Sequence, residues 1–352
     1  MKDHQDHKRK IALIGPFPPP YGGISIHIQR ITRLLPENSY DLYNTSKISQ
    51  PGYYRFYGKI KYIQALVFLF RKYRLIHVHA TDNILRMVFG LIGLAKKNIY
   101  IHLHGMSHLD FLESSHPGGW ILRKLIPRLH ILAVNEEIAE RVSRYNPASV
   151  KIADAFLPPV LNPETLDMVV HQYSDFFSPD RFIICMTGWF SSYQGRDLYG
   201  FDLAAQMIHK LNKEGRKIFL VACINGIRNK NVYSYFLNYI KKSHIENHVL
   251  VIENAAEAWP YMLLSNVFIR PAITDGSSVS VKEALWLEVP VIASDCVKRP
   301  GEVILFKNRN VNEMIEKVVQ LENQQPVNAY LRMKKAMNKE FTCSLIKDVY
   351  GL

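Results

Sequence analysis

The sequence is poor in cysteine and has no long hydrophobic run. Its four cysteines are far apart and form neither a CxxC motif nor a Cys/His cluster with zinc-binding spacing, a pattern typical of reduced thiols in a cytosol. The longest apolar run, Ile63–Phe70, is interrupted by Gln64 and is much shorter than the ~20 residues of a membrane-spanning helix. No apolar core follows the charged start MKDHQDHKRK, so no signal peptide is expected. The sequence therefore predicts a cytoplasmic protein, either soluble or peripheral to a membrane.

Acidic residues are also scarce. The formal net charge is +13, and Leu42–Thr81 contains no acidic residue but seven cations, interleaved with aromatic residues. Cations that reach phosphates, beside aromatic rings at the headgroup boundary, favour contact with an anionic membrane surface at the inner face of the cell membrane. The alternatives are an ordinary surface helix with a solvated basic face, and nucleic-acid binding, which we do not expect because of the site described below.

The chain of 352 residues is long enough for two domains, and each half alternates short apolar strands with helical patterns. This order predicts an α/β fold with two Rossmann-like parallel-sheet domains that face a central cleft. The predicted strands are Lys10–Gly15, Asp41–Tyr43, Leu75–His79, Ile99–His104 and His130–Val134, then Arg181–Thr187, Lys217–Cys223, Val249–Ile252, Val267–Arg270 and Val289–Ala293. The main predicted helices are Ile24–Leu35, Tyr57–Tyr73, Asn83–Ala95 and Glu136–Tyr145, then Gly200–Leu211, Val232–Lys242, Ala258–Leu264 and Val279–Leu287.

A proline-rich break at Ala155–Pro163 predicts the boundary between the two domains. We expect an acceptor-binding domain at 1–157, a linker at 158–178 and a nucleotide-binding domain at 179–325. The remaining residues, 326–352, are expected to form helices that pack back towards the first domain.

The first motif, Gly15–Gly23, follows a predicted strand and opens a predicted helix. Gly22 and Gly23 would let the backbone approach an anionic ligand at the N-terminus of that helix. The motif is not GxGxxG, so a dinucleotide site is weakly supported, and a plain strand-to-helix turn remains an alternative.

Two histidine pairs end neighbouring strands. His77 and His79 lie on one predicted strand, and His102 and His104 lie on the next, where alternation places each pair on one face. His104 precedes Gly105 at the carboxyl end of its strand, where ligands bind, and is therefore a candidate functional residue. The other three are interpreted as core residues. The four together could suggest a metal, but no carboxylate stands beside them at ligand spacing, so no metal site is expected.

The segment Arg270–Asp295 has the strongest pattern. A buried strand ends at Arg270, and a loop containing Asp275 and Gly276 leads to a serine-rich helix start. The exposed N–H groups there favour a pyrophosphate, and Glu283 could accept hydrogen bonds from ribose hydroxyls. The alternative is that Ser280 and Glu283 form only a capping box.

This segment resembles the signature of glycosyltransferase family 4, retaining enzymes of GT-B fold. The family has two acids separated by seven residues, matched here by Asp275 and Glu283, followed by Ala284 and Pro290–Ile292. The resemblance extends over nearly the whole chain, through GPFPPPYGGIS, IHVHA, IHLHG, AVNEEIAERV and GFDLAAQMI.

The resemblance implies roles for residues at matching positions. His104 and the two acids Asp275 and Glu283 would be catalytic, with His104 and Asp275 near the transferred sugar and Glu283 holding the ribose. The backbone of Ser277, Ser278 and Val279 would cradle sugar hydroxyls and phosphate, and Gly22, Gly23 and Gly188 would face the sugar donor. Such enzymes usually need no metal or other cofactor, and the chain has no D-x-D motif.

The sequence departs from the family at four positions. The first acid, Asp275, is Asp where the family has Glu, one methylene shorter. An Arg and a Lys that normally neutralise the leaving diphosphate are replaced by Trp189 and Tyr199. Arg196, Arg270 or Lys282 could replace the missing cations. Glu288 stands where the family has a glycine, at a helix end where the backbone favours a left-handed turn.

The resemblance implies a hexosyltransferase that moves a sugar from a UDP- or GDP-linked donor to a saccharide or polyprenyl-phosphate-linked acceptor in cell-surface polysaccharide synthesis. Two alternatives remain open. A GT-B sugar-nucleotide epimerase would share the fold, and a non-catalytic nucleotide-sugar-binding subunit is favoured by Trp189 and Tyr199.

Overall fold

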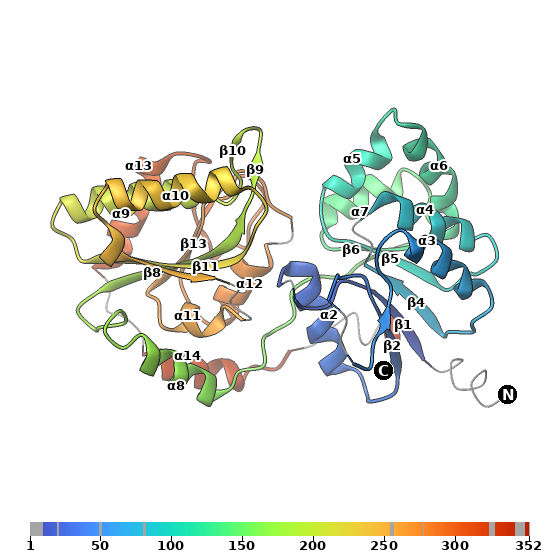
Figure 1. Cartoon of the computed structure of the whole chain (residues 1–352), viewed down its shortest axis with the longest axis horizontal. Helices are drawn as coiled ribbons and strands as arrows, with labels where there is room; N and C mark the ends of the chain where they lie inside the picture. Colours follow the sequence, from blue (N-terminus) through green and yellow to red (C-terminus); the bar gives the residue numbers. More distant parts are fainter. Residues whose placement is uncertain are drawn as a thin grey trace. The chain divides into compact units, whose positions relative to one another are not determined.

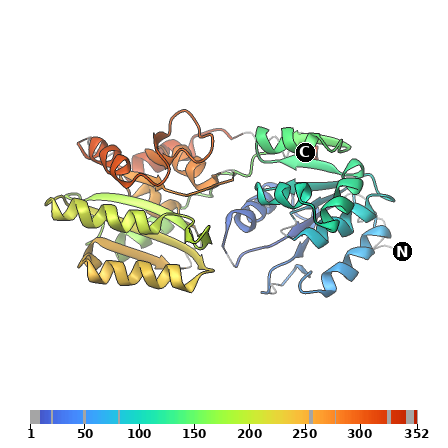
Figure 2. The same cartoon turned by 90° about the horizontal axis from the view of Figure 1, so that it is seen from above.

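The computed structural model describes residues 10–19, 21–48, 51–79, 82–253, 257–276, 278–323, 328–341 and 349–351. The chain forms two compact units (Figures 1 and 2). Unit 1 is Met1–Leu157 together with Thr342–Leu352, and unit 2 is Pro158–Phe341. Within the described residues, no helix is long and apolar enough to cross a membrane.

Unit 1 is built on a seven-stranded sheet in the order β3-β2-β1-β4-β5-β6-β7, in which every pair of neighbours is parallel. The first strand is central because crossovers go to both sides of it, so the strand order reverses between β1 and β4. The strands are β1 (Ile11–Gly15), β2 (Tyr40–Asn44), β3 (Tyr54–Arg55), β4 (Leu75–Val78), β5 (Ile99–Leu103), β6 (His130–Ala133) and β7 (Ser149–Ile152).

Helices cover both faces of this sheet (Figure 1). One group contains α3 (Ile60–Gln64), the 3-10 helix η2 (Ala65–Leu69), α4 (Asn83–Ile92), α5 (Ser107–Glu113), α6 (Pro117–Leu125) and α7 (Glu136–Ser143), which contact one another. A short 3-10 helix, η3 (Ile126–Arg128), follows α6. On α2 (Gly23–Leu34), Ile28 and Ile31 pack into a core that includes Ile11, Leu13 and Tyr350. The chain's last described residues therefore belong to unit 1.

Unit 2 repeats the same topology with a six-stranded parallel sheet, in the order β12-β11-β8-β13-β14-β15. Its first strand is again central, and the strand order reverses between β8 and β13. The strands are β8 (Phe182–Phe190), β11 (Ile218–Ile227), β12 (Val249–Glu253), β13 (Val267–Arg270), β14 (Val291–Ser294) and β15 (Ile304–Phe306), with a separate hairpin of β9 (Ser192–Tyr193) and β10 (Arg196–Asp197).

Successive residues of these strands enter two different cores, because side chains alternate between the faces of a sheet. Ile184 and Leu220 face one core, while Ile183 and Val221 face the other. The first core is covered by α9 (Phe201–Lys213), α10 (Lys230–Lys242) and α13 (Val311–Glu322), and the second by α8 (Pro163–Gln172), α11 (Trp259–Leu263), α12 (Val279–Trp286) and α14 (Ala329–Met337). The 3-10 helix η4 (Glu246–His248) precedes β12. Two buried faces explain why the strands are continuous apolar runs in the sequence.

The structure confirms the predicted fold class, and all ten predicted strands have a counterpart. It differs at the stretch expected to be a linker, 158–178, which contains α8. Leu166 and Val169 of this helix are buried in the second core of unit 2. Pro163 is the first residue of α8, a position that tolerates proline because the N–H there has no partner within the helix.

Candidate functional site

The carboxyl ends of β8 and β13 are neighbours in unit 2, at the point where the strand order reverses. Gly188 lies there in β8, and a Cβ at this position would come within 2.7 Å of the ring of Tyr199. Gly200, with φ 78°, caps α9, and its Cβ would meet Pro271. The two glycines therefore let the loop before α9 pack directly on the loop after β13, which places Tyr199 at the site.

A buried ion cluster, here called the Asp275 cluster, holds the loop that follows β13. Arg270 donates from Nε and Nη2 to the two carboxylate oxygens of Asp275, at 2.9 and 3.0 Å, and from Nη1 to the Thr187 carbonyl at 3.0 Å. Arg299 donates from Nη1 to Asp275 Oδ2 at 3.1 Å. The hydroxyl of Ser278 donates to the same oxygen at 2.9 Å and also contacts Arg299. Asp275 therefore positions both arginines and the start of α12.

The Asp275 cluster carries a net positive charge. Burial alone would raise the pKa of Asp275, but the charges and hydrogen bonds of Arg270 and Arg299 outweigh burial and hold that pKa well below its usual range. Burial likewise acts to lower the pKa of Arg270, and Asp275 more than reverses this effect. Two guanidinium groups against one carboxylate, at the carboxyl edge of a parallel sheet, are suited to an anionic ligand.

The N-terminus of α12 adds to this positive field. Ser278 is the N-cap residue, with φ 49° and ψ 48°, and its side chain makes no capping hydrogen bond. The capping-box interpretation of Ser280 and Glu283 is wrong, because the residue three positions after the cap is Val281. Glu283 lies in the second turn of the helix, not the first, and is only 5% exposed.

The other predicted residues of this segment lie around the same helix start. Val279 is the first residue of α12, and Lys282 is half-buried one turn later. Ser277 lies outside the described residues. Glu288, which stands where the family resemblance implies glycine, has φ 60°, which confirms the left-handed turn expected at the helix end.

Tyr199 and Trp189, which stand where the family resemblance implies cations, each hold an arginine against the ring. The guanidinium of Arg270 lies 4.6 Å from the centre of the Tyr199 ring, and that of Arg228 lies 4.5 Å from the centre of the Trp189 ring. Gly226 opposite Trp189 makes room for the indole, since a Cβ there would come within 2.3 Å of it. Two cations therefore flank the carboxyl end of β8 although the sequence has none at the family positions.

The sequence analysis identified Arg270 as a replacement cation but missed Arg228 and Arg299. Arg228 directly follows β11, and Arg299 lies in the loop after β14, so both come after strands that end at the same edge of the sheet. This position after a strand was the indication that the sequence offered. Arg196 is exposed on the β9–β10 hairpin. Its predicted role in binding the sugar donor remains a prediction.

In unit 1 the glycine motif opens α2. Gly22 is the extended N-cap residue, and its N–H donates to Ser25 Oγ at 3.0 Å. No described atom lies within 4 Å of a Cβ built on Gly23. The first turn of α2 is therefore open to a ligand in the described part of unit 1.

The histidines predicted at the ends of β4 and β5 form a group with a fifth residue, His27 of α2, which the sequence analysis did not identify. His79 Nδ1 and His104 Nε2 are 2.8 Å apart and share a hydrogen bond. His77 is bound through Nδ1 to the Tyr350 hydroxyl at 2.6 Å. Burial lowers the pKa of His27 to about 4 and that of His102 to about 3. The imidazoles of His77, His79 and His104 likewise have pKa values well below normal, first because of burial and then because of the neighbouring histidines.

Residues 179–340 match the family model of glycosyl transferases group 1. The chain is also similar to solved structures over almost its whole length. The fold is GT-B. The matched residues make up nearly all of unit 2, including the Asp275 cluster, α12 and both arginine–aromatic pairs. A search of curated proteins found no significant match.

Three similar structures illustrate the GT-B likeness. Anabaena HepE in complex with UDP is 12% identical with a TM-score of 0.68, and the match covers 93% of this chain and 94% of that one. A glycosyltransferase from Rickettsia africae is 11% identical with a TM-score of 0.63, covering 97% and 99%. A UDP-forming α,α-trehalose-phosphate synthase from Burkholderia xenovorans, in complex with glucose-6-phosphate, is 11% identical with a TM-score of 0.67, covering 93% and 95%. At identities of 11–12%, the similarity to these structures concerns the fold alone.

Proposed function

We propose that the protein is a retaining glycosyltransferase that moves a hexose from a nucleotide-diphosphate sugar to a lipid-linked saccharide in cell-surface polysaccharide synthesis. The observation that carries the proposal is the positive edge of the group 1 domain, where Arg270, Arg299 and Arg228 lie around the carboxyl ends of the strands beside α12. UDP is the ligand of the similar HepE structure. A UDP- or GDP-linked sugar is therefore the donor class that we propose.

In this proposal the diphosphate lies at the N-terminus of α12, where Ser278, Val279 and Lys282 present backbone N–H groups and a cation. Ser277 belongs to the same loop in the sequence. Buried Glu283 accepts hydrogen bonds from the ribose, as the family resemblance implies. Asp275 acts mainly as a positioning residue, since Arg270, Arg299 and Ser278 engage its carboxylate.

Sugar transfer then depends on positioning and on neutralising the leaving diphosphate, because no protein nucleophile is needed for a short-lived oxocarbenium-like sugar. The arginines held by Tyr199 and Trp189 supply charge that the family takes from its Arg and Lys. Unit 1 binds the acceptor, while Gly22 and Gly23 face the sugar donor, and His104 contacts the transferred sugar through its side chain or its backbone.

The decisive experiment compares two arginine–aromatic pairs of unit 2. Arg228→Gln removes a cation at the carboxyl edge of the sheet, whereas Arg181→Gln removes one stacked 4.4 Å from Phe219 at the start of β8. With purified protein, a panel of UDP- and GDP-sugars and a polyprenyl-diphosphate-linked saccharide, we expect Arg228→Gln to lower kcat/KM roughly 10- to 100-fold. Arg181→Gln should transfer sugar at the parental rate.

The same assay tests the alternative of a non-catalytic binding subunit, which the missing Arg and Lys favour. That alternative predicts nucleotide-sugar binding by calorimetry but no release of nucleoside diphosphate with any acceptor. Equal activity of the two arginine variants would contradict the role given to Arg228. Inversion of the anomeric configuration in the product would contradict a retaining transfer.

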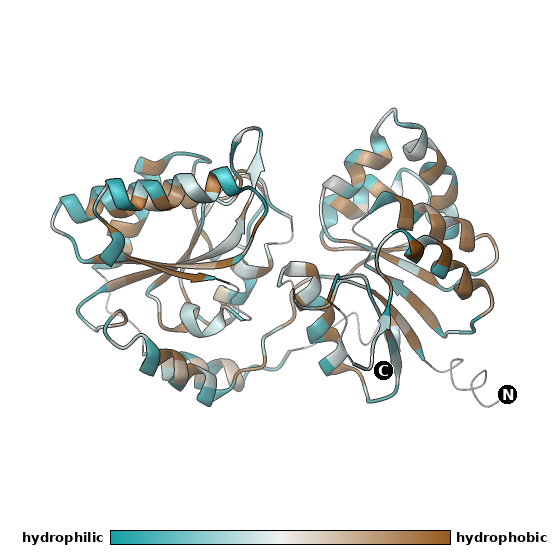
Figure 3. Ribbon diagram, in the orientation of Figure 1, coloured by the Kyte–Doolittle hydropathy of each residue, from teal (hydrophilic) through white to brown (hydrophobic). Residues whose placement is uncertain are grey.

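We also propose that unit 1 binds an anionic membrane surface through α3 and η2. Apolar side chains recur there at helical spacing but face outward: Ile63 is 71% exposed and Phe70 is 75% exposed, with Ile60, Leu66 and Val67 on the same stripe. Figure 3 shows hydrophobic residues along α3 and α4. Lys59, Lys72 and Arg74 are exposed beside this stripe, so apolar insertion and attraction to lipid phosphates act together.

Replacing Ile63 and Phe70 by glutamate is expected to reduce binding to phosphatidylglycerol-containing vesicles at least tenfold, measured by co-sedimentation. Both side chains are exposed, so the fold should be retained. Met168→Glu in unit 2, at a residue that is 63% exposed, is the matched control and should bind like the parent. Unchanged binding of the double variant would contradict this membrane contact.

A further inference from the structure

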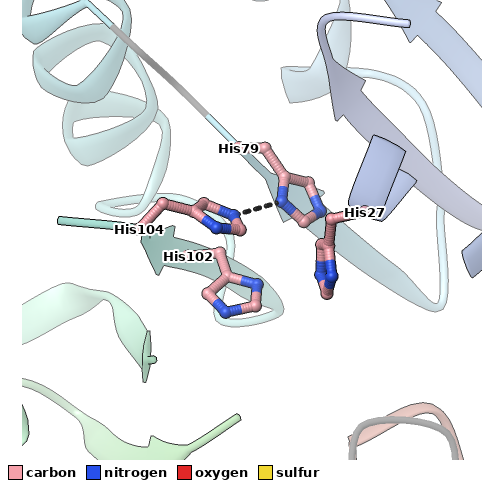
Figure 4. A group of neighbouring side chains, drawn as sticks. All are labelled: His27, His79, His102 and His104. Atoms are coloured by element: carbon pink, nitrogen blue, oxygen red, sulfur yellow. Dashed lines mark hydrogen bonds between the residues drawn. The ribbon is translucent and has the colours of Figure 1, made fainter. Parts of the chain in front are cut away.

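Four histidines of unit 1 gather around one point (Figure 4). His27 comes from α2, His79 directly follows β4, His102 lies in β5, and His104 follows that strand. One ring nitrogen from each lies within 4.8 Å of the others. The first three side chains are at most 1% exposed. Segments far apart in the sequence therefore bring four imidazoles together in the interior.

Backbone carbonyls fix the orientation of two of these rings. His27 Nδ1 is 2.8 Å from the Ala155 oxygen, and His102 Nε2 is 3.0 Å from the Ala153 oxygen. A carbonyl oxygen only accepts hydrogen bonds, so both nitrogens must donate, and the opposite nitrogen of each neutral ring carries a lone pair. These nitrogens, His27 Nε2 and His102 Nδ1, are buried and have no hydrogen-bond partner among the described residues.

This arrangement is the one found around metal-binding histidines. A histidine ligand almost always donates its second ring N–H to a carbonyl or carboxylate, which sets the tautomer and aims the lone pair at the ion. A buried nitrogen lone pair without a hydrogen-bond partner lowers the stability of the folded protein, and coordination to an ion would remove that penalty.

We propose that His27, His79, His102 and His104 bind one divalent first-row transition-metal ion, of which Zn²⁺ is the best fit. Neutral imidazoles suit zinc, nickel and copper, whereas Mg²⁺ and Ca²⁺ require oxygen ligands that this group lacks. Four protein ligands also make a closed site, which is typical of structural zinc.

The side chains must move slightly to bind the ion. Nitrogens placed ~2.0–2.1 Å from a tetrahedral ion are about 3.4 Å apart, so a pair separated by 4.8 Å must approach by roughly 1.4 Å. His79 Nδ1 and His104 Nε2, now 2.8 Å apart, share one proton and must separate by roughly 0.6 Å. For both nitrogens to bind the ion, the ring that now donates this proton must change tautomer, so that each neutral ring carries its one proton on the nitrogen opposite the ion.

A metal at this point would join α2, which begins at the open glycine motif, to the ends of β4 and β5. It would occupy the His104 ring but leave the backbone of His104 and Gly105 for the sugar. Apart from the chain neighbours of Gly105, none of the described residues has an atom within 4 Å of a Cβ built there. The site is therefore structural, and its occupancy does not depend on the proposed transfer reaction.

The test uses untagged full-length protein that has been stripped with a chelator and then titrated with Zn²⁺ or Co²⁺, without any nucleotide or sugar. We expect one equivalent of Zn²⁺ per chain by elemental analysis, a visible Co²⁺ spectrum of four-coordinate nitrogen ligation, and a higher melting temperature with Zn²⁺. Mg²⁺ should give none of these effects.

Three variants locate the ion. The His27→Gln, His102→Gln double variant should bind Zn²⁺ at least 100-fold more weakly. His130→Gln is the matched control, since His130 lies in β6 of the same sheet and pairs with Ser149 and Lys97. A variant lacking His4 and His7 of the N-terminal segment should bind like the parent.

Two results would overturn the proposal. One is wild-type protein that retains less than a tenth of an equivalent of Zn²⁺ and whose melting temperature Zn²⁺ leaves unchanged, a result that does not depend on whether any variant folds. The other is a folded His27→Gln, His102→Gln variant whose Zn²⁺ affinity equals that of His130→Gln. If the variant that lacks His4 and His7 no longer bound Zn²⁺, the ion would lie at the N-terminal segment, and this result would also contradict the proposed site.

Discussion

Replacing Asp275 with alanine is expected to lower the free energy of unfolding of unit 2 by about 3–5 kcal/mol. The carboxylate is the shared partner of two arginines, and the side chains of Arg270 and Arg299 are only 9% and 1% exposed. Removing it leaves two positive charges buried side by side, which costs far more than the loss of one hydrogen bond. Ser278, the cap of α12, would lose the same partner.

Urea unfolding followed by tryptophan fluorescence measures this effect mainly in unit 2, because three of the four tryptophans, Trp189, Trp259 and Trp286, lie there. Asp180→Ala is the matched control. Asp180 also pairs with a cation, Lys217 at 2.7 Å, but its side chain is 57% exposed, so solvent replaces the lost partner and stability should not change measurably. An Asp275→Ala midpoint equal to that of Asp180→Ala would show that the Asp275 cluster does not stabilise unit 2.

The Asp275→Asn variant removes the negative charge of this side chain but keeps its shape, so it measures the contribution of the charge to stability. The amide keeps an oxygen for one arginine but has no net charge, so we expect an intermediate loss of stability. Reduced sugar transfer in this variant would therefore combine a disturbed loop with any direct contact to the sugar. For this reason Arg228, which is exposed, tests the site assignment more cleanly than Asp275 does.

The sequence predicted the strands well because a parallel strand buried on both faces must be a continuous apolar run. It missed strands that are short or exposed, such as β3 at Tyr54–Arg55 and β7 at Ser149–Ile152, whose residues are not buried. It also treated the prolines before α8 as the start of a linker, although Pro163 begins that helix. Local pattern alone does not distinguish a proline that ends an element from one that starts the next.

The site was predictable where its residues are close in the sequence. Arg270 and Asp275 are joined by one loop, and their motif was recognised before their ion pair was known. The sequence analysis missed Arg299, Arg228 and His27, because their partners lie 24 to more than 50 residues away in the chain. Only the order of the strands in the sheet brings these residues and their partners together. Trp189 and Tyr199, at positions where the family resemblance implies cations, were visible in the sequence, whereas the arginines stacked on their rings were not.

The buried histidines also predict that unit 1 loses stability steeply in acid. Burial lowers the pKa of His27 to about 4 and the pKa values of His102 and His108 to about 3, while His77, His79 and His104 are lowered well below 6.5. Above pH 6.5 these groups are neutral in both the folded and the unfolded chain and do not affect stability. Below pH 6.5 these histidines bind protons in the unfolded chain but stay neutral in the folded chain. The free energy of unfolding therefore falls as the pH falls.

The size of the effect follows from the number of groups. Each such histidine lowers the free energy of unfolding by up to about 1.4 kcal/mol per pH unit between pH 6.5 and its folded pKa. If three of the six contribute this full amount, unit 1 loses about 4 kcal/mol per pH unit. That loss approaches the whole stability of an ordinary domain within two pH units. The contribution of His27 to this loss should level off near pH 4, where His27 also binds a proton in the folded state.

Unit 2 provides the internal comparison. Burial, followed by the nearby charge of Asp202, raises the pKa of Asp197 to about 6, so the folded state of unit 2 binds this proton more readily than the unfolded chain and gains stability as the pH falls below 6. The Asp275 cluster keeps its charges throughout this range, because its carboxyl pKa is held so low. Calorimetry of the full chain with a chelator present, at pH 7.5 and pH 5, should therefore show the transition of unit 1 moving down by far more than that of unit 2. Equal shifts of the two transitions would mean that the histidine group takes up protons without unfolding unit 1, and that its interior is more open to water than the burial of His77, His79 and His102 indicates.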